Sequence, residues 1–153
     1  MGVYAGKEKI LAIEKEAASQ VKLCEEFQRL LTIPGVGNIL ALAIMLEVGD
    51  INRFPEVGNY SSYCRCVKSG RFSNGKKKGT GNQKNGNKYL AWAYVEAANF
   101  AIRHCPYARR FYHRKEARTK GVVDIKALSN KLARASYYMM RDKVPYDPRR
   151  LFG

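Results

Sequence analysis

One stretch of this sequence cannot belong to a hydrophobic core, and it therefore divides the chain. Residues 73–89 read SNGKKKGTGNQKNGNKY, in which glycine, lysine and asparagine predominate and no acidic residue occurs. Glycine raises the entropic cost of ordering a backbone and neighbouring lysines repel one another, so the run has little means of burying itself. We predict a flexible basic loop here, with the folded parts of the chain on either side.

Both flanks show the periodicity of amphipathic helices. Before the loop, apolar residues recur at spacings of three and four over 6–31, and an apolar helix follows over 38–48. After the loop, the same periodicity predicts helices over 88–104, 107–119 and 122–142. The fold class is therefore mainly α, and it ends in a C-terminal helical bundle.

The spacing also predicts which side chains form the core of that bundle. On the first of its helices the expected face comprises Leu90, Tyr94, Ala97, Ala98, Ala101 and Ile102, widened by Trp92 and Phe100. On the last helix it comprises Ile125, Leu128, Leu132, Ala135, Tyr138 and Met139.

The pattern of the N-terminal residues predicts that the chain is divided into two parts. Residues 1–28 form a coiled-coil-like helix, and residues 29–153 form the main domain. The near-heptad spacing suits either a coiled coil with another chain or packing on the same chain. We favour self-association to a dimer or tetramer, because so short a chain has little core to cover this helix.

Between the first two helices lies IPGVG, within a predicted helix-hairpin-helix-like element at 30–48. Pro34 ends the first helix, and Gly35 and Gly37 permit a tight turn. Backbone N–H groups at the start of the second helix can then hold a phosphate without reading bases. The alternative is an ordinary helical corner used only for packing.

Charge is distributed unevenly and indicates the kind of partner. Residues 1–56 carry 6 Lys/Arg and 8 Asp/Glu, whereas residues 57–153 carry 22 and 5. So positive a surface favours polyphosphates, because each neutralised phosphate releases counterions. No stretch approaches the roughly 20 apolar residues of a membrane span, and no signal-peptide pattern begins the chain. We therefore expect a cytoplasmic, nucleoid-associated bacterial or archaeal protein.

The cysteines do not complete a metal site. Cys64 and Cys66 form a CxC pair and Cys105 follows His104, but no second pair with ligand spacing is present. We predict buried, inert thiols and no metal. His104 and His113 are expected at a helix end and on a solvated basic face.

The order of the motifs resembles a known family. IPGVG leads into EVGDINRF, and YCRCV, a serine, KNGNKYL and KLARASYYMMRDKVPYDP follow. Over residues 29–148 this is similar to the C-terminal transposase domain of insertion-sequence family 110 (the 116/110/902 group). The resemblance implies DNA recombination: a serine of this domain forms a phosphoserine link to cleaved DNA, a noncoding bridge RNA selects target and donor, and the assembly is a tetramer.

The resemblance also implies a part that we do not find in this chain. Family members carry an N-terminal RNase-H-like domain with an Asp-Glu-Asp-Asp set, where Mg²⁺ would bind. We expect Glu47 and Asp50 to cap helices or face solvent rather than replace those acids. No cofactor is expected in this chain, which on its own is predicted to bind and assemble without cutting.

By the family pattern the nucleophile is Ser73, because its spacing to Gly86-Asn87 fits. Ser69 is the rival, because it keeps a literal Ser-Gly. Attack on a phosphodiester needs cations on the phosphate oxygens, which the neighbouring lysines supply. The residues that we assign to nucleic-acid binding are Arg71, Lys76, Lys77, Lys78, Lys84, Asn87, Lys88, Gly35 and Gly37.

Two other functional classes are weighed against this assignment. A noncatalytic helix-hairpin-helix module that binds DNA or RNA would need the same basic residues but no nucleophile. A P-loop hydrolase is disfavoured, because GKKKGTGN lacks the Gly-Lys-Ser/Thr ending and a preceding strand. A serine hydrolase is disfavoured too, since no histidine lies beside the serine.

Overall fold

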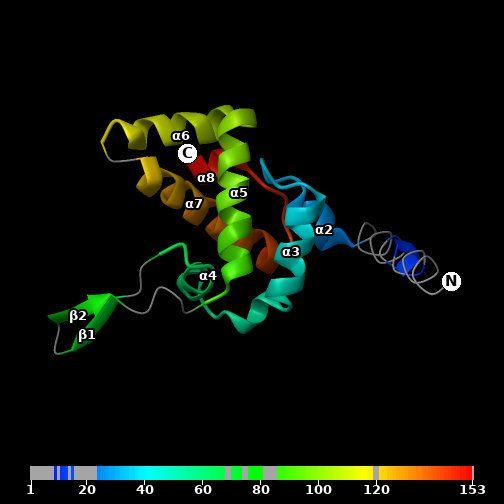
Figure 1. Cartoon of the computed structure of the whole chain (residues 1–153), viewed down its shortest axis with the longest axis horizontal. Coiled ribbons are helices and arrows are strands. Elements are labelled where there is room, and N and C mark those ends of the chain that lie inside the picture. Colours follow the sequence, from blue (N-terminus) through cyan, green and yellow to red (C-terminus); the bar gives the residue numbers. More distant parts are fainter. Residues whose placement is uncertain are drawn as a thin grey trace.

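The computed structural model describes residues 9, 11–13, 15, 24–67, 70–73, 76–80, 86–118 and 121–152, with backbone only at 70–73, 76–80 and 121–123. The elements are α2 (Glu25–Leu30), α3 (Asn38–Val48), the 3-10 turn η1 (Ile51–Arg53), α4 (Val57–Tyr63), β1 (Gly70–Ser73), β2 (Lys76–Thr80), α5 (Lys88–His104), α6 (Pro106–Glu116), α7 (Gly121–Asp142) and α8 (Pro148–Phe152). Helices predominate, which confirms the mainly α fold (Figure 1). None of these described helices has both the length and the apolarity needed to cross a membrane.

Helix α5 lies at the centre and packs against α3, α6 and α7 (Figure 1). Its inner face is built from small side chains, and Ala97 and Ala101 are fully buried. The turn before α3 presses on this face at Gly35, where φ is +88° and an added Cβ would collide with the Ala97 carbonyl oxygen. Glycine is therefore required at position 35, both for its backbone angle and for the close approach.

Buried tyrosines tie the helices together through their hydroxyl groups. The hydroxyls of Tyr60 on α4 and Tyr94 on α5 lie 2.6 Å apart. Tyr137 on α7 donates to the Phe54 carbonyl oxygen at 2.9 Å. Burial raises the pKa values of Tyr60 and Tyr94 well above the ordinary range. These phenols stay neutral, and each hydrogen bond satisfies a polar group that burial would otherwise penalise.

The predicted core faces hold for most positions and are wrong for three. Trp92 is 47% exposed and Phe100 is 41% exposed, because only one side of α5 is covered. At 100° per residue, Trp92 lies roughly 160° round the helix from the buried Leu90, whereas Phe100 lies roughly 80° from it, at the edge of the buried face. On α7, Tyr138 is 38% exposed and Tyr137 takes its place in the core.

The helix predicted over 6–31 is not continuous. The described residues 9, 11–13 and 15 are helical, but Cys24 has extended backbone angles and α2 begins at Glu25. Phe27 and Leu30 of α2 are buried against the core, so packing sets the direction of this short helix. The division of the chain after residue 28 stays a prediction.

The predicted flexible loop contains a two-stranded antiparallel sheet. Strand β1 pairs with β2 in the register Gly70↔Thr80, Phe72↔Lys77 and Ser73↔Lys76, with an irregularity between Gly70 and Phe72. The register leaves two residues, 74 and 75, between the strands. They are Asn-Gly, a strong signal for a tight hairpin, although the composition of the run indicated a loop. Backbone pairing satisfies the polar groups on the paired edges of the two strands.

Candidate nucleic-acid interface

The segment that carries β1 and β2 is attached at both of its ends to one point on the helical body, the end of α4. The segment leaves α4 after Tyr63, and its return is held there because the Asn87 backbone N–H donates to the Tyr63 carbonyl oxygen at 2.7 Å. Gly86 has a φ of +107°, and a Cβ there would press on the same carbonyl group. The Gly86-Asn87 motif therefore closes the base of the hairpin.

The Asn87 side chain joins three helices at this base. Its amide oxygen accepts from the backbone N–H groups of Tyr89 and Leu90, which caps α5. Its amide nitrogen donates to Glu47 Oε2 at 2.6 Å and lies 3.4 Å from the Tyr63 hydroxyl. Asn87 thus has a positioning role between α3, α4 and α5, and its predicted contact with nucleic acid stays a prediction.

Arg53 completes this cluster, which we call the base cluster: Glu47, Arg53, Tyr63 and Asn87. Arg53 donates to the carbonyl oxygens of Glu47 and Val48, and its guanidinium lies 4.8 Å from the Tyr63 ring centroid. Hydrogen bonds from Arg53 and then Asn87 lower the pKa of the Tyr63 phenol. Sequence reasoning missed Arg53 and Tyr63, because neither belongs to a local chemical motif.

The two acids of this region have different roles. Asp50 accepts from the Asn52 backbone N–H at 2.9 Å and caps η1, which confirms the capping expected of it. Glu47 neither caps nor simply faces solvent, since it bonds to Asn87 from 40 residues away.

The backbone register brings Ser73 together with part of the predicted cation set. Ser73 is the last residue of β1 and pairs directly with Lys76, while Lys77 lies opposite Phe72. Arg71 lies on β1 and Lys78 on β2. Ser69 and Lys84 lie outside the described residues. Lys88, the first residue of α5, is exposed, and its ammonium nitrogen lies 5.1 Å from the Tyr89 ring centroid.

The second predicted phosphate site lies at the other end of α3. Gly37 is the N-cap residue of α3, is exposed and has open space around its Cα. The first turn of α3 has neither a capping side chain nor an acidic residue, so its N–H groups can donate hydrogen bonds to an anion. The structure therefore does not bring Gly35 and Gly37 to the hairpin base, since 11 residues of helix, roughly 16 Å, intervene.

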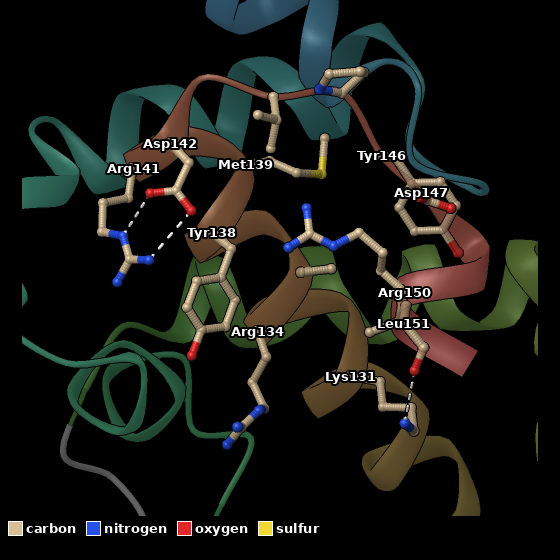
Figure 2. Close-up of a pocket in the computed structure, with 13 residues that line it drawn as sticks. Lys131, Arg134, Tyr138, Met139, Arg141, Asp142, Tyr146, Asp147, Arg150 and Leu151 are labelled. Atoms are coloured by element: carbon tan, nitrogen blue, oxygen red, sulfur yellow. Dashed lines mark hydrogen bonds and ion pairs between the residues drawn. The ribbon is translucent and has the colours of Figure 1, made fainter. Parts of the chain in front are cut away.

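A further basic surface was not among the predicted sites. A pocket of about 460 Å³ lies between α7 and α8, and Figure 2 shows the cationic and aromatic side chains that line it. Four of its lining residues recur at helical spacing on α7, namely Lys131, Arg134, Tyr138 and Arg141. That helical spacing is the sequence signal from which this basic surface could have been predicted. We did not predict it, because Tyr138 was assigned to the core.

Three of the four cysteines, Cys64, Cys66 and Cys105, are buried as predicted, and Cys24 is half-buried. Cys64 and Cys66 are buried, and burial raises the pKa of the Cys66 thiol to about 12. Among the described residues, no group of three or more His, Cys, Asp or Glu side chains is placed to hold a metal ion.

A helical body with a basic hairpin and a basic pocket defines a candidate nucleic-acid-binding protein, and comparison with known proteins gives its family. The model of the Transposase IS116/IS110/IS902 family matches residues 27–113, more than half of the chain. This chain belongs to that family, which confirms the resemblance seen in the motifs.

Curated relatives agree with this assignment. The transposase for insertion sequence element IS1111A of Coxiella burnetii is 33% identical over 91 residues, 60% of this chain and 25% of the relative. A probable family 20 transposase of Pseudomonas aeruginosa is 25% identical over 145 residues, 92% of this chain and 43% of the relative. The transposase for IS1328 of Yersinia enterocolitica is 29% identical over 134 residues, 85% of this chain and 40% of the relative. The chain thus spans less than half the length of each.

Proposed function

We propose that this chain is the DNA-contacting part of an insertion-sequence transposase and that Ser73 is its nucleophile. The observation that carries the proposal is the register of the hairpin, in which Ser73 ends β1 opposite Lys76. The hairpin base is held on the helical body by Gly86 and Asn87, so Ser73 has a defined attachment as well as reach.

The proposed reaction is a transesterification. The Ser73 hydroxyl oxygen attacks a DNA phosphorus atom, a new P–O bond to serine forms, and the bond to one bridging oxygen breaks. The serine proton passes to a base and the departing oxygen gains a proton, so one phosphodiester replaces another and no oxidant or reductant is needed. The cations of the hairpin stabilise the charge that builds on the phosphate oxygens, above all Lys76, which pairs with Ser73, and Lys78, which shares its face of the sheet because alternate strand residues lie on one face.

Replacing Ser73 with alanine tests the assignment. In an assembly that supplies the RNase-H-like domain and guide RNA implied by the family resemblance, Ser73→Ala should abolish covalent protein–DNA product. Affinity for DNA should change less than about twofold, because the lysines remain. The readout is mass spectrometry of the nucleotide-linked peptide, with Ser69→Ala as the matched control. A covalent adduct that persists in Ser73→Ala and disappears in Ser69→Ala would transfer the role to Ser69.

A noncatalytic nucleic-acid-binding module is the second candidate. It is favoured by the exposed, uncapped start of α3 at Gly37, which can hold a phosphate without any chemistry. Under this alternative, neither serine variant changes any product, and binding across a salt series is the only activity.

We further propose that the N-terminal helix mediates self-association. Leu11 and Ile13 of this helix are 63% and 67% exposed, so these two apolar side chains lie uncovered in a single chain. Deleting residues 1–22, which spares α2, should lower the mass measured by light scattering while leaving the unfolding free energy within about 0.5 kcal/mol. An unchanged mass after the deletion would place the contact elsewhere. A structured guide RNA is a further proposed partner of the basic surfaces.

A further inference from the structure

We infer that the pocket between α7 and α8 binds one unpaired nucleotide of a nucleic-acid strand, with its two flanking phosphates on Arg134 and Arg150 and its base on Tyr138. The inference rests on the proposed nucleic-acid-binding function, and it assigns a second site, separate from the hairpin. It begins from the size of the pocket, because about 460 Å³ falls within the roughly 300–1,000 Å³ of small-ligand sites.

The walls of the pocket combine an apolar floor with a cationic rim. Helix α7 supplies Ala135, Tyr138 and Met139, and the segment leading to α8 supplies Val144 and Pro145. Figure 2 shows the Arg150 side chain reaching across from α8 into the space in front of Met139, while Arg134 extends from α7 in another direction, away from Arg150. A ligand that fits must therefore carry both an apolar, flat part and an anionic part.

The acids of the pocket neutralise this rim only in part. Two carboxylates, Asp142 and Asp147, stand against four cations among the lining residues, and Arg150 is close enough to help lower the pKa of Asp142. Asp142 accepts from Arg141 at 2.8 and 3.2 Å, so its two carboxylate oxygens are engaged. Asp147 accepts from the Arg149 backbone N–H and caps α8. Within the described part of the chain, Arg134 and Arg150 form no ion pair with a carboxylate at contact distance. Their charges are available to an anion.

Lys131 adds to the positive charge of the site. Its ammonium group donates to the Leu151 carbonyl oxygen at 3.1 Å and lies 5.0 Å from the Phe111 ring centroid, which fixes its position. The surrounding cations come from two helices: Arg134 on α7, with Arg114 and Lys115 on α6. An incoming phosphate would relieve this repulsion between cations.

Tyr138 provides the surface for a base. The Arg141 guanidinium lies 4.8 Å from its ring centroid, and Tyr137 packs against it edge to face. These contacts hold the ring while 38% of the residue stays exposed beside the pocket. Stacking of a base on an aromatic ring requires an open face on the base, which paired bases inside a duplex do not offer. An unpaired nucleotide therefore matches the pocket better than a duplex does.

The test compares three labelled oligonucleotides by fluorescence anisotropy at one salt concentration. They are a single strand, the blunt duplex of the same sequence and that duplex with one unpaired nucleotide, each made as DNA and as RNA. The full chain should bind the single strand and the bulged duplex more tightly than the blunt duplex. The DNA and RNA arms show which strand the pocket prefers.

Variants assign the effect to the pocket. Tyr138→Ala should weaken binding of the single strand and the bulged duplex about tenfold and leave the blunt duplex within about twofold. Tyr138→Phe should restore the affinity, because it keeps the ring. Arg134→Gln with Arg150→Gln should weaken all arms and reduce the salt slope by about two. Arg103→Gln with Arg110→Gln, which removes two exposed arginines that do not line this pocket, is the charge-matched control.

The outcomes separate the two proposals. If the unchanged chain binds none of the oligonucleotides, the proposed function fails and the pocket assignment fails with it. If the chain binds but Tyr138→Ala lowers affinity for all forms equally, or for none, the nucleotide pocket is overturned and nucleic-acid binding stands. Circular dichroism of each variant at the assay temperature shows that a loss of affinity is not a loss of fold.

Discussion

The hairpin and the α7–α8 pocket present positive charge in opposite ways. The hairpin carries its cations on two strands that pair with each other, Arg71 on β1 and Lys76, Lys77 and Lys78 on β2, and Figure 1 shows the pair standing apart from the helices. Gly86 and Asn87 hold it at its base. The pocket carries its cations on α7, where Leu132 lies in the core, and on α8, which packs against the core through the half-buried Leu151 and Phe152.

The two sites therefore suit different tasks: the hairpin can reach a DNA strand, and the pocket can hold a ligand in a fixed position. A segment attached at one point can follow a DNA strand, which suits a nucleophile that must meet its phosphodiester. A pocket between two packed helices keeps a fixed shape, and it can therefore discriminate between forms of nucleic acid. If the two sites work in these different ways, substitutions at the hairpin base and in the helical body should have independent effects.

The largest expected effect is on the helical body. Gly35→Ala places a Cβ against the Ala97 carbonyl group at a φ of +88°, so we expect a loss of about 3 kcal/mol in the free energy of unfolding. Gly37→Ala is the matched control, because nothing lies near its added Cβ and its φ of −96° suits alanine. Its effect should stay within about 1 kcal/mol. Urea denaturation followed by circular dichroism measures both, and equal losses would contradict the packing role of Gly35.

A smaller effect is expected at the hairpin base. Asn87→Asp keeps an acceptor for capping α5 but places a carboxylate beside Glu47, whose Oε2 lies 2.6 Å from the present amide nitrogen. Repulsion raises the folded-state pKa values of both acids. Near pH 4 the free energy of unfolding should therefore nearly equal that of the unsubstituted chain. It should fall by about 1–2 kcal/mol below that value as the pH rises to 7.

Two controls isolate this effect. Asn87→Ser keeps a capping oxygen without a charge and should show no such pH dependence. Adding Glu47→Gln to Asn87→Asp should remove the repulsion and restore stability at pH 7. Oligonucleotide affinity of the pocket should be unchanged in all three variants. A change there would show that the base cluster and the pocket are coupled, contrary to the comparison.

The smallest effect concerns the titration of Lys131. Burial, followed by Arg134, Lys115 and Arg114, lowers its pKa below the usual 10.5. A bound phosphate would raise that pKa, so binding takes up a proton once the pH exceeds the folded-state value. Affinity for a single strand should then fall about two- to threefold as pH rises through that value, and Lys131→Met should flatten the profile. Identical profiles for both proteins would show that no phosphate approaches Lys131.

Several features follow from the sequence alone. The helices over 38–48 and 88–104 have the predicted bounds, because apolar periodicity and the flanking turn residues act within a few residues of each other. The family membership follows from the order of short motifs. The hairpin was also readable, since Asn74-Gly75 signals a tight turn, although the abundance of lysine and glycine led us to a loop.

Only the tertiary structure decides the rest. Periodicity shows that a helix has an apolar face, but it does not show what covers that face. For this reason Trp92 and Phe100 are exposed, and Tyr137 rather than Tyr138 is buried. The bond between Glu47 and Asn87 and the pocket between α7 and α8 join residues that lie far apart along the chain. Contacts of that kind depend on how the helices pack, and the residues around one position do not predict which distant segment packs against it.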